Sequence, residues 1–183
     1  RRLQETPDAP EDLARLPRLQ LADLERTIRT IPSEAGEVGG LVTFYHDLFT
    51  NGIVYLDLGF DLHLLPQELL PYVPLFGRAL LETGTERADF VKLGQRIGMR
   101  TGGIGSHSLV SSKRNDPEAT AWLFLRGKGL TTQVEEILAI IEEVLLSARL
   151  DNRERFTQMV LEEKAGEEAG LVPGGHRVVN LRL

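Results

Sequence analysis

A strict alternation of apolar and polar residues between positions 53 and 62 constrains the fold more than any other feature of this sequence. The apolar positions are Val54, Leu56, Leu58, Phe60 and Leu62, and the positions between them are Tyr55, Asp57, Gly59 and Asp61. Successive side chains of a β-strand point to opposite faces of the sheet. The pattern therefore predicts a strand with one buried face and one polar face.

The residues before this strand predict its pairing partner. Positions 41–49 are rich in β-branched and aromatic residues, and Asn51-Gly52 separates them from the alternating segment. Asn-Gly between two such runs favours a turn with positive φ, whose twist matches that of the flanking strands. The sequence therefore predicts an antiparallel hairpin between Leu41–Phe49 and the alternating strand.

Two helices are predicted to follow the hairpin. Positions 64–82 have the apolar spacing of a helix, but Pro71 and Pro74 each remove a backbone donor. We therefore expect a helix that is broken or starts late, and Gly84 suits its end. Asp89 is placed to cap the next helix, in which apolar residues recur at positions 90, 93 and 97.

The second half of the chain is predicted to repeat this order. After glycines at positions 102, 103 and 105, Ile104–Ser112 and Thr120–Arg126 are predicted to form a second hairpin. Thr132 and Glu135 have the spacing of a capping box at the start of a helix. The apolar stripe predicted for that helix is Val134, Ile137, Leu138, Ile141 and Leu145.

A last helix is predicted to begin at Asp151 as its cap and to carry Phe156, Met159 and Val160. The acidic run Glu162–Glu168 is predicted to be a solvated face. The order of hairpin, two helices, hairpin and two helices is typical of the α+β class, with an antiparallel sheet and helices packed on one face.

The length of 183 residues is that of one domain with an attached connector. Residues 1–40 are punctuated by prolines and end in a polar, glycine-rich stretch, so they are predicted to be the connector, with one short helical stretch around 19–28. The predicted domain spans residues 41–183. Because the chain does not begin with Met, we expect it to be part of a longer protein.

Composition excludes several classes of function. The chain has no Cys, which excludes disulfides, Cys-based zinc sites, iron–sulfur clusters and a Cys nucleophile. A formal net charge of −6 argues against nucleic acid as a partner, because a nucleic-acid footprint needs a basic face. No apolar run approaches the roughly 18 residues of a membrane span, so no membrane partner is predicted.

Candidates for metal chemistry are scattered. No two of the four histidines, His46, His63, His107 and His176, lie three or four residues apart, and neither H-E-x-x-H nor H-x-x-E-H occurs. The sequence therefore predicts no helical zinc pair. A site assembled from distant strands stays open as an alternative.

Other catalytic patterns are incomplete. Ser106-His107-Ser108 lacks the flanking glycines of a nucleophile elbow, and neighbours on a strand point to opposite faces. Asp57 and Asp61 are about 13 Å apart along a strand, too far for a direct acid–base pair. The corner Gly102–Gly105 precedes a strand rather than a helix, which favours a structural corner over a phosphate loop. An enzyme that binds a small molecule at this corner is the third and weakest hypothesis.

Three segments resemble one known family. They are Thr50–Leu62, Leu64–Phe76 and Arg100-Thr101-Gly102-Gly103-Ile104. Together they resemble the presequence-protease branch of the pitrilysin/insulinase zinc metallopeptidases. More narrowly, they are similar to the first domain of the C-terminal half, so that residues 1–40 would be the linker between the halves.

The resemblance implies a fold that has lost its chemistry. In the family, an H-x-x-E-H helix holds zinc, and its Glu is the general base. At the matching positions this chain has Leu75, Arg78 and Ala79, none of which can bind zinc or take a proton from metal-bound water. The resemblance therefore implies no catalytic, cofactor-binding or metal-binding residue in this segment, with Zn²⁺ held elsewhere in the parent protein.

The expected function is that of a non-catalytic domain of a zinc-dependent metalloendopeptidase that degrades unstructured oligopeptides in a closed chamber. The alternative is a structural or peptide-binding member of the same superfamily without protease activity. Expected partners are the remaining domains of the same chain and a peptide substrate. The arginine-rich basic set favours the bacterial cytoplasm over an organellar matrix.

Overall fold

A computed structural model of the chain describes residues 6–17, 19–28 and 30–180. The chain divides into two units, residues 1–49 and residues 50–183. The predicted connector falls in the first unit, and its residues 1–5, 18 and 29 lie outside the described part.

The first unit contains one β-hairpin and two short helical turns. Its elements are α2 (Pro10–Leu13), the 3-10 turn η1 (Leu21–Asp23), β1 (Glu34–Val38) and β2 (Leu41–Tyr45). The helical stretch predicted around 19–28 is present only as η1. Strand β2 pairs antiparallel with β1 through a turn at Gly39-Gly40, where both residues have positive φ. The predicted hairpin between Leu41–Phe49 and the alternating strand is therefore wrong.

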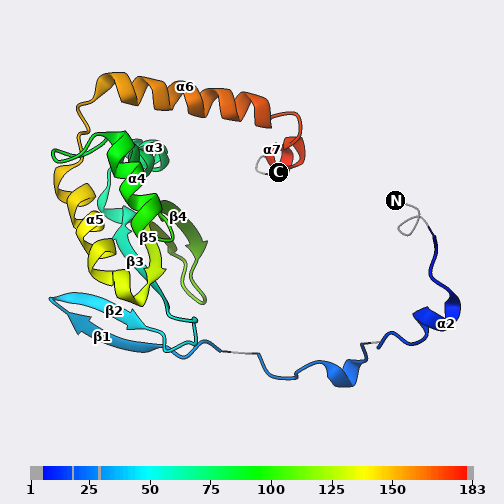
Figure 1. The fold of residues 1–183 in the computed structure, drawn as a ribbon. Coiled ribbons are helices and arrows are strands. Elements are labelled where there is room, and N and C mark those ends of the chain that lie inside the picture. The colour runs from blue at the N-terminus through cyan, green and yellow to red at the C-terminus, as the bar shows by residue number, and fades with distance from the viewer. Residues whose placement is uncertain (1–5, 18, 29, 181–183) are drawn as a thin grey trace. The chain divides into compact units, whose positions relative to one another are not determined.

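The second unit contains a three-stranded antiparallel sheet in the order β3-β5-β4 (Figure 1). Strand β3 (Ile53–Asp61) pairs along its whole length with β5 (Ala119–Leu130), and β5 pairs with β4 (Ile104–Ser112). The second predicted hairpin is confirmed. Asn51 and Gly52 do have positive φ, but they lead into β3 from an irregular segment rather than joining it to a neighbouring strand.

The helices of the second unit begin and end close to the predicted positions. They are α3 (Val73–Glu82), α4 (Phe90–Arg100), α5 (Val134–Ser147), α6 (Arg153–Gly170) and α7 (Gly175–Asn180), with 3-10 turns η2 (Leu62–Leu64), η3 (Gln67–Tyr72) and η4 (Thr131–Gln133). The late start predicted for the first helix is confirmed, because Pro71 lies in η3 and α3 begins only at Val73. The cap at Asp89 is confirmed by a 2.9 Å bond from the backbone N–H of Lys92.

Two predicted caps are wrong. A 3-10 turn at Thr131–Gln133 precedes α5, whose N-cap is Gln133 without a side-chain bond, so Thr132 and Glu135 form no capping box. The cap of α6 is Asn152 rather than Asp151, because its side chain accepts the backbone N–H of Arg155.

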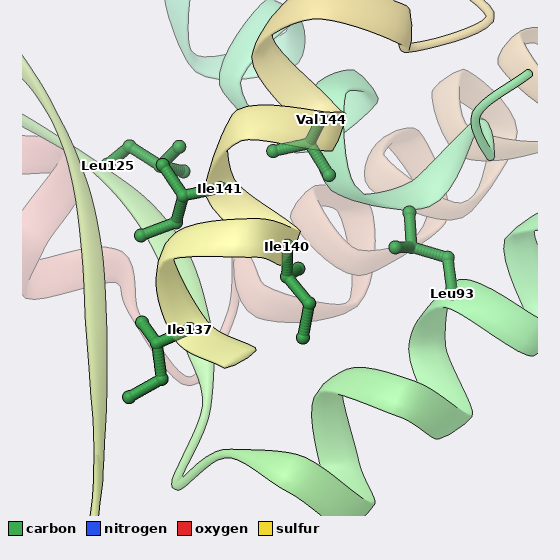
Figure 2. Packing of buried hydrophobic residues seen from close by; sticks show 6 residues of the cluster. All are labelled: Leu93, Leu125, Ile137, Ile140, Ile141 and Val144. Atoms are coloured by element: carbon green, nitrogen blue, oxygen red, sulfur yellow. The ribbon is translucent and has the colours of Figure 1, made fainter. Parts of the chain in front are cut away.

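The predicted helical face on the sheet is confirmed, with one shift in residues. Helices α3 and α5 contact the sheet, and α4 packs on α3 and α5. In Figure 2, Ile137 and Ile141 of α5 point toward Leu125 of β5, whereas Ile140 and Val144 lie on the side of Leu93 of α4. The predicted stripe omitted Ile140 and Val144, which are fully buried, and included Leu138, which is 47% exposed.

Glycines let both helices approach the sheet closely. A Cβ on Gly129 would lie 2.8 Å from Cδ1 of Ile137, so β5 leaves room for α5. A Cβ on Gly77 of α3 would lie 2.6 Å from Oγ and 2.7 Å from Cβ of Ser106 in β4. The spacing of α3 from β4 therefore depends on the absence of a side chain at Gly77.

A buried carboxylate joins α4, α5 and the loop that precedes α4. Glu143 accepts hydrogen bonds from Thr85 Oγ1 at 2.5 Å and from Arg96 Nη1 at 2.6 Å. Arg96 also donates to Glu136 at 2.7 Å. The bond from Thr85, followed by the bond and charge of Arg96, lowers the pKa of the Glu143 carboxyl below its ordinary value of 4.5.

Replacing Gly77 by Ala is expected to lower the free energy of unfolding by about 1–3 kcal/mol, because the new methyl group would overlap Ser106. Chemical denaturation measures the loss. Adding Ser106→Gly should restore part of it, because that change removes the two atoms that lie closest to the new methyl group.

Gly94→Ala is the matched control for Gly77→Ala. Gly94 is also helical, but a Cβ there meets nothing within 4 Å, so the change should stabilise the protein by up to about 1 kcal/mol. Equal effects of the two substitutions would contradict the close packing of α3 on β4.

Glu143→Gln is expected to lower the free energy of unfolding at pH 7 by about 1.5–3 kcal/mol, the usual range for hydrogen bonds to a charged group. Because the pKa of Glu143 is depressed in the folded state, its contribution is complete above about pH 4.5 and is lost as the pH falls further. The difference between wild type and variant should therefore shrink in acid. The neighbouring Glu142→Gln, at an exposed residue with no ion pair among the described residues, should show neither effect.

Candidate functional site

Leu75, Arg78 and Ala79, the residues that the resemblance implies have replaced a zinc helix, lie on α3. Ala79 is 2% exposed and belongs to the buried side of the helix. Leu75 is half-buried, and the side chain of Arg78 is 26% exposed. Arg78 contacts an ion cluster, and Leu75 and Ala79 line an apolar groove.

Arg78 is the centre of an ion cluster between α3 and α6. Its Nε donates to Glu82 Oε1 at 2.8 Å, its Nη2 to Glu162 at 2.6 Å and its Nη1 to Glu163 at 3.1 Å. Nη1 also donates to the backbone carbonyl of Met159 at 3.3 Å. A guanidinium that occupies all three of its nitrogens in this way fixes α6 against α3.

Arg155 completes this cluster, which we call the α3–α6 ion cluster (Arg78, Glu82, Arg155, Glu162 and Glu163). It donates to Glu82 Oε2 and to Glu162 Oε1, both at 3.0 Å. The bond to Glu82 is the main cause that raises the pKa of Arg78, and the bond from Arg155 is the main cause that lowers the pKa of Glu162. The run Glu162–Glu168 is exposed, as predicted, and its first two members also bind Arg78.

The same helix also borders an apolar groove. The groove has a volume of about 200 Å³, and its lining residues are Tyr72, Leu75, Phe76, Ala79, Leu150 and Phe156. Leu75 and Ala79 therefore face apolar surroundings. These side chains can hold an apolar group, but they offer no ligand atom to a metal.

The histidines and acidic residues are spread over both units. Within the described residues, no group of three or more His, Cys, Asp or Glu side chains could hold a metal ion. His46 Nδ1 lies 2.9 Å from the carbonyl of Pro32 in the first unit, and His63 Nδ1 lies 2.7 Å from Asp61. Asp57 binds Arg126 at 3.0 Å, whereas Asp61 binds His63. The two carboxylates therefore have different partners and form no acid–base pair with each other.

The serines and glycines singled out in the sequence also have structural partners. Ser106 lies against α3 at Gly77, whereas His107 pairs with Phe124 in the strand register, so they form no nucleophile–base pair. At the glycine corner, Gly102 N–H donates to the carbonyl of Lys128 at 2.7 Å and Gly103 N–H donates to Thr101 Oγ1 at 3.0 Å. The corner thus extends the β-sheet instead of presenting free amides to an anion.

The sheet face opposite the helices carries a row of aromatic and cationic side chains that the sequence analysis missed. Trp122 and Phe124 of β5 stack with ring centroids 6.2 Å apart, and the Arg126 guanidinium lies 5.2 Å from the Phe124 centroid. Lys128 follows at the next position of this face. The signal was the same period-two alternation that identified β3, because Leu123, Leu125, Gly127 and Gly129 are the buried positions between them.

Comparison with known proteins places the chain beside peptidases. A family model, described as the associated region of subfamily C of the M-16 peptidases, matches residues 1–183. Presequence protease 1, chloroplastic/mitochondrial, of Arabidopsis thaliana is 38% identical over 180 residues, which are 98% of this chain and 17% of that protein. Protein HypA of Clostridium perfringens is 34% identical over 177 residues, 96% of this chain and 18% of that protein.

A more distant relative, the mitochondrial presequence protease of Danio rerio, is 27% identical over 167 residues, 91% of this chain and 16% of that protein. The chain therefore spans less than one fifth of the length of these three relatives. Among the described residues, no helix has both the length and the apolar character that a membrane crossing requires.

Arg78→Met tests the role assigned to the α3–α6 ion cluster. The substitution removes the bonds to Glu82, Glu162 and Glu163, and it leaves three carboxylates next to one another. We expect the free energy of unfolding to fall by about 1–3 kcal/mol and hydrogen exchange in α6 to accelerate. Arg153→Met, at an exposed residue of α6 with no ion pair in the described part of the chain, is the control. Equal exchange in both variants would show that Arg78 does not hold α6.

Proposed function

This chain belongs to the family associated with subfamily C of the M-16 peptidases, in its presequence-protease branch, and from that premise we propose that it is a non-catalytic domain of a zinc-dependent metalloendopeptidase. The observation that carries the proposal is the state of α3. The positions that match the family's H-x-x-E-H hold Leu75, Arg78 and Ala79, and these side chains contribute to an apolar groove and an ion cluster.

The proposed parent protein holds Zn²⁺ in another domain and hydrolyses unstructured oligopeptides in a closed chamber. This domain would form part of the chamber wall. Its partners would be the remaining domains of the same chain and the peptide substrate, and residues 1–40 would be the linker between the two halves. The great length of the relatives compared with this chain supports a multidomain parent.

We place the parent in the bacterial cytoplasm. The similarity to a protein of Clostridium perfringens supports a bacterial source. The names of the plant and fish relatives assign those proteins to mitochondria or chloroplasts, so an organellar matrix is the competing location.

A zinc titration of this chain and of the full-length protein tests the proposal. We expect no tight stoichiometric zinc site in the chain alone and no hydrolysis of an unstructured peptide, because α3 offers zinc no ligand. The full-length protein should bind zinc stoichiometrically and cleave the same peptide. Tight zinc binding by the chain alone would overturn the assignment of a non-catalytic domain.

Two variants of the full-length protein separate the enzyme from the alternative, a structural or peptide-binding member without protease activity. Arg78→Met should leave the zinc content unchanged, whereas loss of a histidine in an upstream H-x-x-E-H helix should abolish both zinc binding and cleavage. A full-length protein without zinc and without cleavage would favour the alternative.

A further inference from the structure

A second cavity lies in the sheet unit, away from the groove of α3. It has a volume of about 320 Å³ and is formed by the start of β3, the end of α4, the turn 101–102 and the end of β5. Pockets that bind small ligands begin at about 300 Å³, so this one has room for a group the size of a single amino acid. We call it the β3–α4 pocket.

The walls of the β3–α4 pocket are apolar and open. Ile53, Met99 and Leu130 line it together with the ring of Tyr55. Met99 is 75% exposed and Leu130 is 58% exposed. Large apolar side chains gathered around one cavity favour a ligand with an apolar body.

Two cationic side chains in this apolar cavity favour an anionic ligand. Arg100 and Lys128 line it, and none of the described lining residues is a carboxylate. Neither cation has an ion pair within the described part of the chain, although the protein as a whole carries a net charge of −6. Two unpaired cations in a partly apolar recess attract an anionic group.

The backbone around Lys128 is held in place before any ligand binds. Its carbonyl accepts from Gly102 N–H at 2.7 Å, and its N–H donates to the carbonyl of Gly103 at 3.1 Å. Its stem lies across Gly102, since a Cβ at that position would be 3.1 Å from Lys128 Cγ. An ordered backbone and stem reduce the entropy lost when the ammonium binds an anion.

The type of anion follows from the hydrogen bonds that are already made. Gly102 N–H and Gly103 N–H, which a phosphate would need, donate to Lys128 and Thr101 instead. The Thr101 hydroxyl itself donates to the Ile97 carbonyl at 2.7 Å. A phosphate site usually provides several free backbone amides. The side chains of Arg100 and Lys128 are therefore better suited to a small monoanion attached to an apolar group.

We propose that the β3–α4 pocket binds a carboxylate attached to an apolar body, with Arg100 and Lys128 as the groups that bind the carboxylate. A peptide can supply this chemistry from its C-terminal residue or from an acidic side chain. The binding requires no zinc and no cleavage, so its outcome is independent of the proposed peptidase function.

Titration of the 183-residue chain by NMR tests the proposal. N-acetyl-leucine, which has a free α-carboxylate, should shift the backbone amide signals of residues 100–102 and 128–130 and reach saturation. N-acetyl-leucinamide, which has the same body without the charge, should bind at least about tenfold more weakly. Glutamic acid blocked as its N-acetyl α-amide distinguishes an acidic side chain from a C-terminus as the source of the carboxylate.

Lys128→Gln and Arg100→Gln should each weaken the binding of N-acetyl-leucine by about tenfold, because each removes one charge. Arg114→Gln, in the loop at the other end of β4 and β5, is the matched control and should bind as the wild type does. If Lys128→Gln fails to fold, Arg100→Gln decides alone, since Arg100 is exposed at the end of α4. Equal binding of leucine and leucinamide, equal affinity for inorganic phosphate, or unchanged binding in Arg100→Gln would overturn the proposal.

Discussion

The close approach of two helices to one face of the sheet is the constraint on which the rest of this unit depends. Gly127 and Gly129 leave space on β5 for Ile137 and Ile141 of α5, and Gly77 lets α3 lie directly on β4. Because α4 packs on α3 and α5, its place follows from theirs. Helix α5 is buried between β5 and α4, so one of its faces packs toward Leu125 and another toward Leu93 (Figure 2).

Two ion networks hold these helices together: one around Glu143 joins α4 to α5, and the α3–α6 ion cluster joins α3 to α6. Glu143 is almost fully buried and joins α5 to Thr85 and Arg96, so separating α4 from α5 would leave a carboxylate without its partners in an apolar environment. The α3–α6 ion cluster is more exposed and therefore weaker per bond, but it joins α6 to α3 through five side chains. Arg78 is thus a structural cation that holds these two helices together.

Local signals predicted most of the elements, and long-range pairing accounts for the main error. The alternation in β3, the late start of α3 and the cap at Asp89 depend on neighbouring residues, and each was predictable from them. The partner of β3 was not, because β5 lies more than fifty residues away and the Asn51-Gly52 turn is favourable whether or not it joins two strands. Leu138 was placed in the core because apolar spacing alone does not show how two layers divide the faces of α5. Neither cavity was predictable, since each is lined by segments from distant parts of the sequence.

The two cavities differ in what they can select. The groove beside α3 is lined by apolar and aromatic side chains, so its affinity for a bound group depends on the size and apolar area of that group. The β3–α4 pocket adds two cations without an ion pair among the described residues to an apolar wall, so it favours ligands that carry a negative charge. On the proposed function, a domain of this kind contributes binding energy at a distance from the reacting atoms, where such energy positions a substrate. On the proposed function, selection of one part of a peptide is therefore the contribution that this domain's chemistry still allows.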